Sequence, residues 1–223
     1  GLLVDAYDDL ASRASGQAKD DLEKRADATF QSLAKLSPNN PFVQARQELV
    51  TENKSPRDAI RKRTADLQKN PNDLKNLGRL AELYRQAWVQ ASDARDERAK
   101  TEIVQSGNAF FESAGAGLSE QERQSFVRLA ADFFATTQQR DSGEKFLRDY
   151  IDTAKDAGGR ILAQIVLARL LEMSRDLSEA ERAYQQAQVM VRDYNDSDPA
   201  KASRVRSRVG IELIDFYQRS GRP

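Results

Sequence analysis

The fold is decided by residues 77–88, which read LGRLAELYRQAW. Apolar and aromatic side chains recur there at intervals of three and four residues, the spacing that places them on one face of an α-helix. They are Leu77, Leu80, Ala81, Tyr84 and Trp88. Alternating patterns typical of strands are absent from the chain, and β-branched residues are sparse. The sequence therefore predicts an all-α fold.

Prolines and capping residues divide the chain into separate helices. Three prolines follow a side chain that can accept a hydrogen bond at a helix start, in Asn40-Pro41, Ser55-Pro56 and Asp198-Pro199. Two further pairs have capping-box spacing, Ser119 with Glu122 and Ser178 with Glu181. From these signals and the apolar periodicity we predict about eleven helices: 2–14, 18–36, 41–53, 56–69, 73–94, 96–114, 120–138, 142–156, 158–174, 179–194 and 199–220.

The composition excludes several classes of function. The 223 residues are 31% charged and 39% hydrophobic, with 35 basic and 35 acidic side chains, so there is no overall attraction to nucleic acid or anionic membranes. The absence of Cys and His removes disulfides, thiolate chemistry, the usual zinc sites and every triad that needs an imidazole. We therefore expect neither a cofactor nor a metal.

The chain carries no stretch that we expect to insert into a membrane. Its longest apolar run, residues 161–171, is interrupted by Gln164 and Arg169 and is shorter than the ~20 residues that span a bilayer. No signal peptide is visible, and the chain begins with Gly1 rather than Met. We expect a soluble domain whose signal or anchor, if one exists, lies outside these residues, and the compartment stays open.

Small and large side chains repeat along the chain at intervals near 34 residues. One unit contains Ala26, Phe30, Leu33 and Pro38, and Ala59 and Pro71 repeat its first and last members 33 residues later. The pattern of 77–84 recurs at 127–134 and again at 164–171. In the following helices a small residue precedes a large one by four positions, in the pairs Gly107–Phe111, Gly143–Leu147 and Ala180–Tyr184.

At these residues the chain resembles the tetratricopeptide repeat family, whose units are helix–turn–helix pairs. The resemblance covers most of residues 20–220 and implies a right-handed α-solenoid of antiparallel helix pairs, forming a single domain over 1–223. Small residues let paired helices approach, and large residues fill the gap between pairs. The match is uneven at Arg63, Gln164 and Gly210, and an irregular extended unit occupies about 86–119. An irregular helical bundle is the alternative.

The last predicted helix, 199–220, looks like the first helix of a pair followed by its turn at Ser220-Gly221. A terminal repeat without its second helix exposes an apolar face. We therefore expect either that the chain is a fragment of a longer protein or that this helix acts as a cap.

No pattern in the sequence points to catalysis. Acidic pairs such as Asp8-Asp9 and Glu120 with Glu122 lie at polar helix starts, where carboxylates interact favourably with the helix dipole. The segment 115–117 (Gly-Ala-Gly) lacks a following Lys-Ser or Lys-Thr and is interpreted as a linker. A basic run near the last helix start has three readings that stay open: a solvated face, a site for an acidic protein and a nucleic-acid contact. It comprises Lys201, Arg204, Arg206 and Arg208.

The resemblance implies that the first helices of the pairs line a concave surface that binds a partner. At matching positions that surface would contain Lys75, Arg79, Glu82, Arg128, Asp132, Leu162, Ile165, Arg169, Arg208, Ile211 and Asp215. It lacks the Lys/Asn set that clamps a carboxyl terminus in chaperone-binding members, since Glu82 stands where Asn is expected.

Helix 158–174 is apolar around most of its circumference, which is typical of a helix buried on all sides. Either the chain itself covers the inner face, or Leu162 and Ile165 form an apolar floor for a partner. The large aromatics of the extended unit, Trp88 and Phe110-Phe111, are expected in a core, and residues 93–100 are expected to form a turn.

Together these features predict a non-catalytic protein–protein interaction scaffold that binds a peptide or domain along the concave surface. The alternatives are a self-assembly module that docks on another copy through the C-terminal helix, and an accessory or regulatory region of a larger enzyme or complex. The identity of the partner is not encoded in any motif that we recognise.

Overall fold

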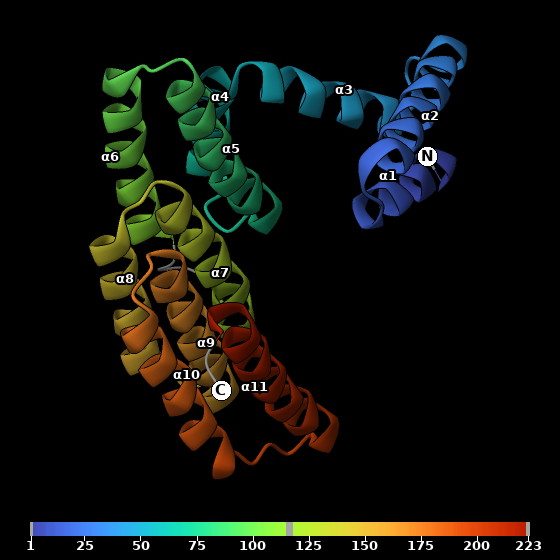
Figure 1. Cartoon of the computed structure of the whole chain (residues 1–223). Helices are drawn as coiled ribbons and strands as arrows, with labels where there is room; N and C mark the ends of the chain where they lie inside the picture. The colour runs from blue at the N-terminus through green and yellow to red at the C-terminus, as the bar shows by residue number, and fades with distance from the viewer. Residues whose placement is uncertain (1, 115–117, 222–223) are drawn as a thin grey trace. The chain divides into compact units, whose positions relative to one another are not determined.

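The computed structural model describes residues 2–114 and 118–221, with the backbone alone at Gln121. Over these residues the protein is all-helical, with eleven helices and no strand, as the sequence predicts (Figure 1). The helices are α1 (Leu2–Arg13), α2 (Gly16–Leu36), α3 (Pro41–Lys54), α4 (Pro56–Lys69), α5 (Leu74–Asp93), α6 (Glu97–Ala114), α7 (Glu120–Thr136), α8 (Arg140–Thr153), α9 (Ala157–Met173), α10 (Leu177–Arg192) and α11 (Pro199–Ser220).

Three of the predicted capping signals are confirmed at helix starts. The side chains of Asn40 and Asp198 accept from the backbone N–H groups two residues later, and Ser119 with Glu122 forms the predicted capping box. The predicted capping box at Ser178 is wrong, because α10 begins at Leu177, two residues before the predicted start at 179, and Asp176 caps it. The predicted end of α8 at 156 is also wrong, because Asp156 lies outside the helix and caps α9.

The chain divides into two compact units, residues 1–55 and residues 56–223. In the first unit, α2 packs on α1 and contacts α3. Its small core contains Val4, Ala26, Phe30 and Val43, so two residues of the first repeat pattern are buried as a core. An ion pair between Asp8 of α1 and Arg46 of α3 links the ends of this unit. The single repeat domain over 1–223 stays a prediction.

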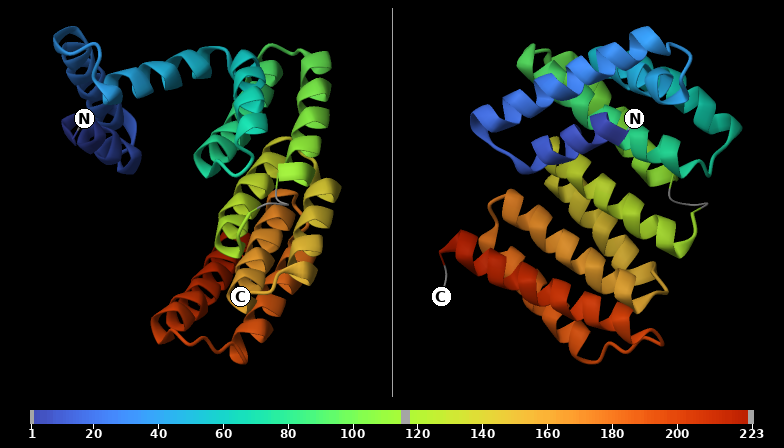
Figure 2. Two further views of the ribbon diagram at one scale, coloured as in Figure 1. Left: turned by 180° about the vertical axis from the view of Figure 1, so that it is seen from behind. Right: turned by 90° about the vertical axis from the view of Figure 1, so that its right-hand side faces the viewer.

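The second unit contains α4–α11 around one continuous core. Most helices contact their neighbours in the sequence, and α5, α7, α9 and α11 also contact one another in that order. Figure 2 shows α7, α9 and α11 lying one after another along one side of this unit. This order of contacts is compatible with the solenoid that the sequence predicts, and the solenoid itself stays a prediction.

Three helical hairpins of the second unit share the same backbone turn. Each contains a residue in the left-handed region, with φ values of 56°, 59° and 63°. The following N–H donates to the carbonyl five residues earlier, a Schellman-type closure of the helix end, at 2.8 to 3.0 Å. The left-handed residues are Arg95, Gln138 and Arg175. None is Gly, so the composition of these turns did not reveal their common geometry.

Small residues occur where two helices approach closely. A Cβ at Gly107 of α6 would lie 2.3 Å from the Phe133 ring of α7. At Gly143 of α8, a Cβ would lie 2.7 Å from Phe134 Cβ and 2.8 Å from Leu170 Cδ2. Both contacts are far closer than carbon atoms tolerate. The small residues of the repeat pattern are therefore required at these two helix crossings.

The extended unit contributes aromatic side chains to the core. Phe111 is fully buried and Phe110 is nearly so, which confirms the expectation for this pair. Phe110 stacks on Tyr84 of α5 at a ring distance of 5.4 Å. Trp88 is only partly buried, and the Lys100 ammonium lies 5.3 Å from its ring. The turn at 94–96 falls inside the predicted 93–100 segment.

Helix α9 lies at the centre of the second unit. Ten of its 17 residues are buried, because α7, α8, α10 and α11 all pack against it. Its apolar circumference is thus explained by neighbours on several sides. In the part of the chain that the structure describes, no helix has the length and apolar character needed to cross a membrane.

Candidate partner-binding groove

A groove of about 1490 Å³ in the second unit is lined mainly by residues of α7, α9 and α11. This volume exceeds the range usual for small-molecule pockets, and the lining comes from several turns of each helix. Its lining combines apolar and charged side chains. The apolar lining includes Leu129, Leu162, Val166, Met173 and Val205.

The structure brings together six of the eleven residues predicted for the concave surface. These six line the groove: Arg128, Asp132, Leu162, Ile165, Arg169 and Arg208. Glu82 and Asp132 line a second, smaller pocket of about 300 Å³ between α5, α7 and α9. The other four predicted residues line neither space: Lys75, Arg79, Ile211 and Asp215.

The two apolar residues predicted for the floor have different environments. Ile165 is 3% exposed and belongs to the core. Leu162 is partly buried, and so is Val166 one helical turn later on the same side of α9. Leu162 and Val166 therefore offer accessible apolar surface to the groove, whereas Ile165 contributes mainly to the interior.

One wall of the groove contains a buried carboxylate held by two arginines. Glu212 of α11 is 1% exposed, and its oxygens accept from Nε and Nη2 of Arg169 at 2.8 and 2.7 Å. Nη2 of Arg208, one turn earlier on α11, lies 2.6 Å from the same carboxylate. We call Arg169 and Arg208 the arginine pair. It links α9 to α11 and lies at the groove surface.

A second polar network lies at the other end of the groove, around Asp156. This carboxylate caps α9 by accepting from Gly159 N at 2.7 Å, and it also accepts from Gln124 of α7 at 2.8 Å. Lys201 of α11 donates to its other oxygen at 3.2 Å. One side chain thus connects all three helices that line the groove.

Replacing Asp156 with alanine is expected to lower the free energy of unfolding by about 2 kcal/mol, because a helix cap and a partly buried ion pair are lost together. Asp156→Asn can still cap α9, so its free energy of unfolding should fall by roughly half as much as that of Asp156→Ala. Denaturation followed by the fluorescence of Trp88, the only tryptophan, measures both variants. Equal losses for the two variants would contradict the capping role.

Burial and neighbouring charge oppose each other at Asp132, on the α7 side of the groove. Desolvation raises the pKa of its carboxyl group, and the positive charges of Arg128, Arg85 and Arg169 partly offset this effect. Glu82 differs, because a hydrogen bond from Arg85 lowers its pKa. Asp132 is therefore a groove carboxylate whose charged form is disfavoured by burial and favoured by three arginines, one each on α5, α7 and α9.

The predicted acidic pairs and basic run have partners within the chain. Asp9 pairs with Arg13, and Glu122 completes the cap of α7. Of the basic run, Lys201 pairs with Asp156 and Asp196, Arg204 with Asp198 and Arg208 with Glu212, while Arg206 donates to the Tyr194 carbonyl. The Gly-containing segment 115–117 lies outside the described residues. Among the residues that are described, no group of three or more His, Cys, Asp or Glu side chains could hold a metal ion.

Sequence reasoning missed Gln124, Asp156 and Glu212. Gln124 lies one turn before Arg128 on α7, so the helical period could have indicated it. Asp156 could have been found as a cap, whereas no local signal distinguishes Glu212 from the other acidic residues of the chain.

A scan against protein-family models and searches of curated proteins and of solved structures find no match to this chain.

Proposed function

We propose that this protein is a non-catalytic interaction scaffold that binds a peptide, or a segment of a partner domain, in the groove lined by α7, α9 and α11. The observation that carries the proposal is the groove itself, whose lining combines the accessible apolar side chains of Leu162 and Val166 with charged side chains. Polypeptide binding commonly combines an apolar anchor with a polar rim. The repeat pattern supports the same role, because solenoids of helix pairs offer extended concave surfaces for partners.

The apolar side chain of Leu162, which lines the groove, gives the direct test. Leu162→Asp is expected to abolish binding of a groove-directed peptide, because a carboxylate would have to be desolvated where an apolar side chain docks. A peptide of about 16 residues, about 24 Å long as a helix, is selected from a phage-displayed random library on the 223-residue protein. Its affinity for the variant is then measured by fluorescence anisotropy.

The matched control is Val189→Asp on α10, where the apolar side chain is 56% exposed and does not line the groove. This variant should bind the selected peptide with unchanged affinity, because exposed substitutions rarely alter a fold. Equal effects of the two variants, or failure of any peptide to be enriched, would argue against a peptide-binding groove.

Self-association is a second candidate, favoured by two exposed isoleucines on α11. Ile211 is 54% exposed and Ile214 is 58% exposed, which leaves apolar surface on one face of this helix. Light scattering at several protein concentrations tests this candidate. Assembly is supported if the mass of the wild type rises with concentration and the mass of Ile214→Asp stays at that of a monomer. A constant monomer mass excludes it.

A further inference from the structure

The arginine pair has hydrogen-bonding capacity beyond its contact with Glu212. A guanidinium carries five N–H donors, and Arg169 commits Nε and Nη2 to the buried carboxylate. In the described part of the chain, neither arginine donates a hydrogen bond to any other group. Their side chains are 45% and 52% exposed, so the remaining donors are accessible to a ligand.

The positive and negative side chains around the arginine pair do not cancel in charge. The two guanidinium groups share the carboxylate of Glu212. The groove lining as a whole has an excess of cationic side chains: Arg128, Arg169, Lys201, Arg204 and Arg208 stand against the carboxylates of Glu120, Asp132 and Asp156. Asp132 of α7 interacts with Arg169 through its charge, yet no ion pair within 4 Å joins them in the described structure. An acidic group that enters the groove therefore finds unmatched positive charge together with free donors.

The buried carboxylate also restricts the motion of the pair. The bidentate contact holds Arg169 in one orientation, and Glu212 itself lies in the interior, so the arginine side chains lose little further freedom when they bind. A guanidinium recognises a carboxylate through parallel N–H···O bonds, which are stronger than neutral hydrogen bonds.

We propose that the arginine pair is the specificity site of the groove and that it binds a carboxylate of an acidic polypeptide segment. An apolar side chain near that carboxylate docks on Leu162 and Val166, which line the same groove. The inference rests on the proposed function, and it adds the chemistry of the partner: acidic residues next to an apolar anchor.

The same arginines could in principle contact a phosphate of a nucleic acid, but the surroundings favour a polypeptide. Apolar side chains lie beside the pair, no aromatic other than Tyr150 lines the groove in the described structure, and the protein has no net charge. Non-specific nucleic-acid binding depends on an overall excess of positive charge and on aromatic stacking, whereas this protein is neutral as a whole and Tyr150 is the one aromatic side chain that lines the groove among the residues described.

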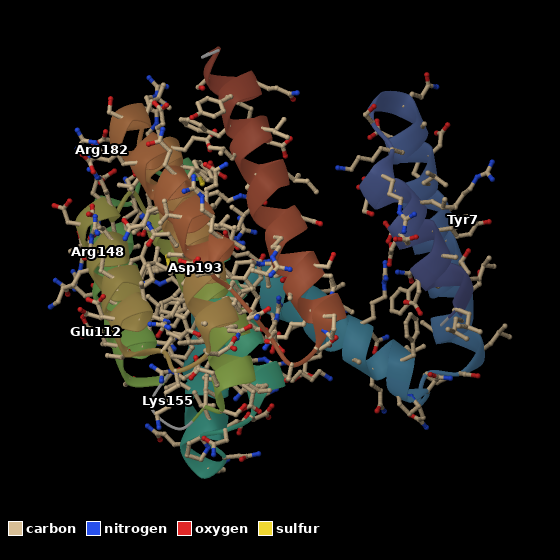
Figure 3. All side chains as sticks on the ribbon, turned by 90° about the horizontal axis from the view of Figure 1, so that it is seen from below. Tyr7, Glu112, Arg148, Lys155, Arg182 and Asp193 are labelled. Atoms are coloured by element: carbon tan, nitrogen blue, oxygen red, sulfur yellow. The ribbon has the colours of Figure 1, made fainter. Side chains whose placement is uncertain are left out.

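The test compares wild type with Arg208→Gln, which leaves the bidentate contact between Arg169 and Glu212 in place. Peptides are selected from the random library on each protein, and a wild-type-selected peptide is synthesised with its Asp and Glu residues retained or replaced by Asn and Gln. Arg182→Gln is the matched control. This residue lies on α10 at the outer edge of the unit in Figure 3, and it is 74% exposed and paired with Glu179.

We expect the wild-type selection to enrich Asp and Glu next to apolar residues. Arg208→Gln should weaken binding of the acidic peptide about tenfold, because one charge-assisted contact is lost. Wild type and Arg208→Gln should bind the neutral peptide with the same affinity. Arg182→Gln should match wild type in every measurement. Thermal unfolding of Arg208→Gln, followed through Trp88, should stay close to that of wild type.

Two other outcomes separate this inference from the proposed function. If neutral or basic peptides are enriched, or Arg208→Gln weakens acidic and neutral peptides equally, the carboxylate site is wrong and the groove remains a binding surface. If no peptide is enriched, both proposals fail. Binding of oligo-dT that is lost in Arg208→Gln and not displaced by the acidic peptide would assign the pair to phosphate and overturn the inference.

Discussion

Replacing Ile165 with aspartate is expected to lower the free energy of unfolding of the 56–223 unit by about 4 kcal/mol. Ile165 is 3% exposed in the core of this unit, so the change removes buried apolar area and introduces a carboxylate with no partner. Chemical denaturation followed through Trp88 fluorescence reports on this unit directly, since the tryptophan lies on α5.

The matched control for this prediction is Leu162→Asp, one turn earlier on the same helix. Leu162 is only partly buried and faces the groove, so its replacement should cost less than half as much stability while removing peptide binding. Burial raises the pKa of a carboxyl group introduced at 165. The loss in free energy of unfolding caused by Ile165→Asp, relative to wild type, should therefore increase from pH 4 to pH 7. Equal losses for the two variants would contradict the division between interior and groove.

Replacing Gly143 with leucine is expected to lower the free energy of unfolding by about 3 kcal/mol. Even a single added carbon would lie 2.7 Å from Phe134 Cβ, an atom next to the backbone of α7 that cannot rotate away. Overfilling of this kind forces helices apart and costs more than the helix propensity gained by removing a glycine. Denaturation curves monitored by circular dichroism and by Trp88 fluorescence measure the loss.

Gly210 of α11 provides the control, because it is also a glycine within a helix but a Cβ added there would meet nothing within 4 Å. Gly210→Ala is expected to stabilise the protein by about 1 kcal/mol through the lower entropy of its unfolded chain and better helix propensity. If Gly143→Leu were as stable as wild type, α7 and α8 could not be as close as the structure has them.

The sequence by itself determined the features that depend on near neighbours in the chain. Helix formation follows from apolar spacing of three and four residues, and helix starts follow from caps such as Asn40 and Asp198, which bond to N–H groups two residues away. The small residues Gly107 and Gly143 were likewise recognisable from their recurrence before large residues. These interactions are local, so the eleven helices of the described residues could be predicted without knowledge of their packing.

Only the tertiary structure decided which side chains face the groove and which lie inside. Leu162 and Ile165 are equally apolar in the sequence, and their difference arises from the helices that cover one of them. Glu212 is one acidic residue among 35, and it becomes distinct because α9 brings Arg169, 43 residues away, against it. Burial and ion pairing between distant segments depend on how helices meet in space, and no local pattern in the sequence encodes that arrangement.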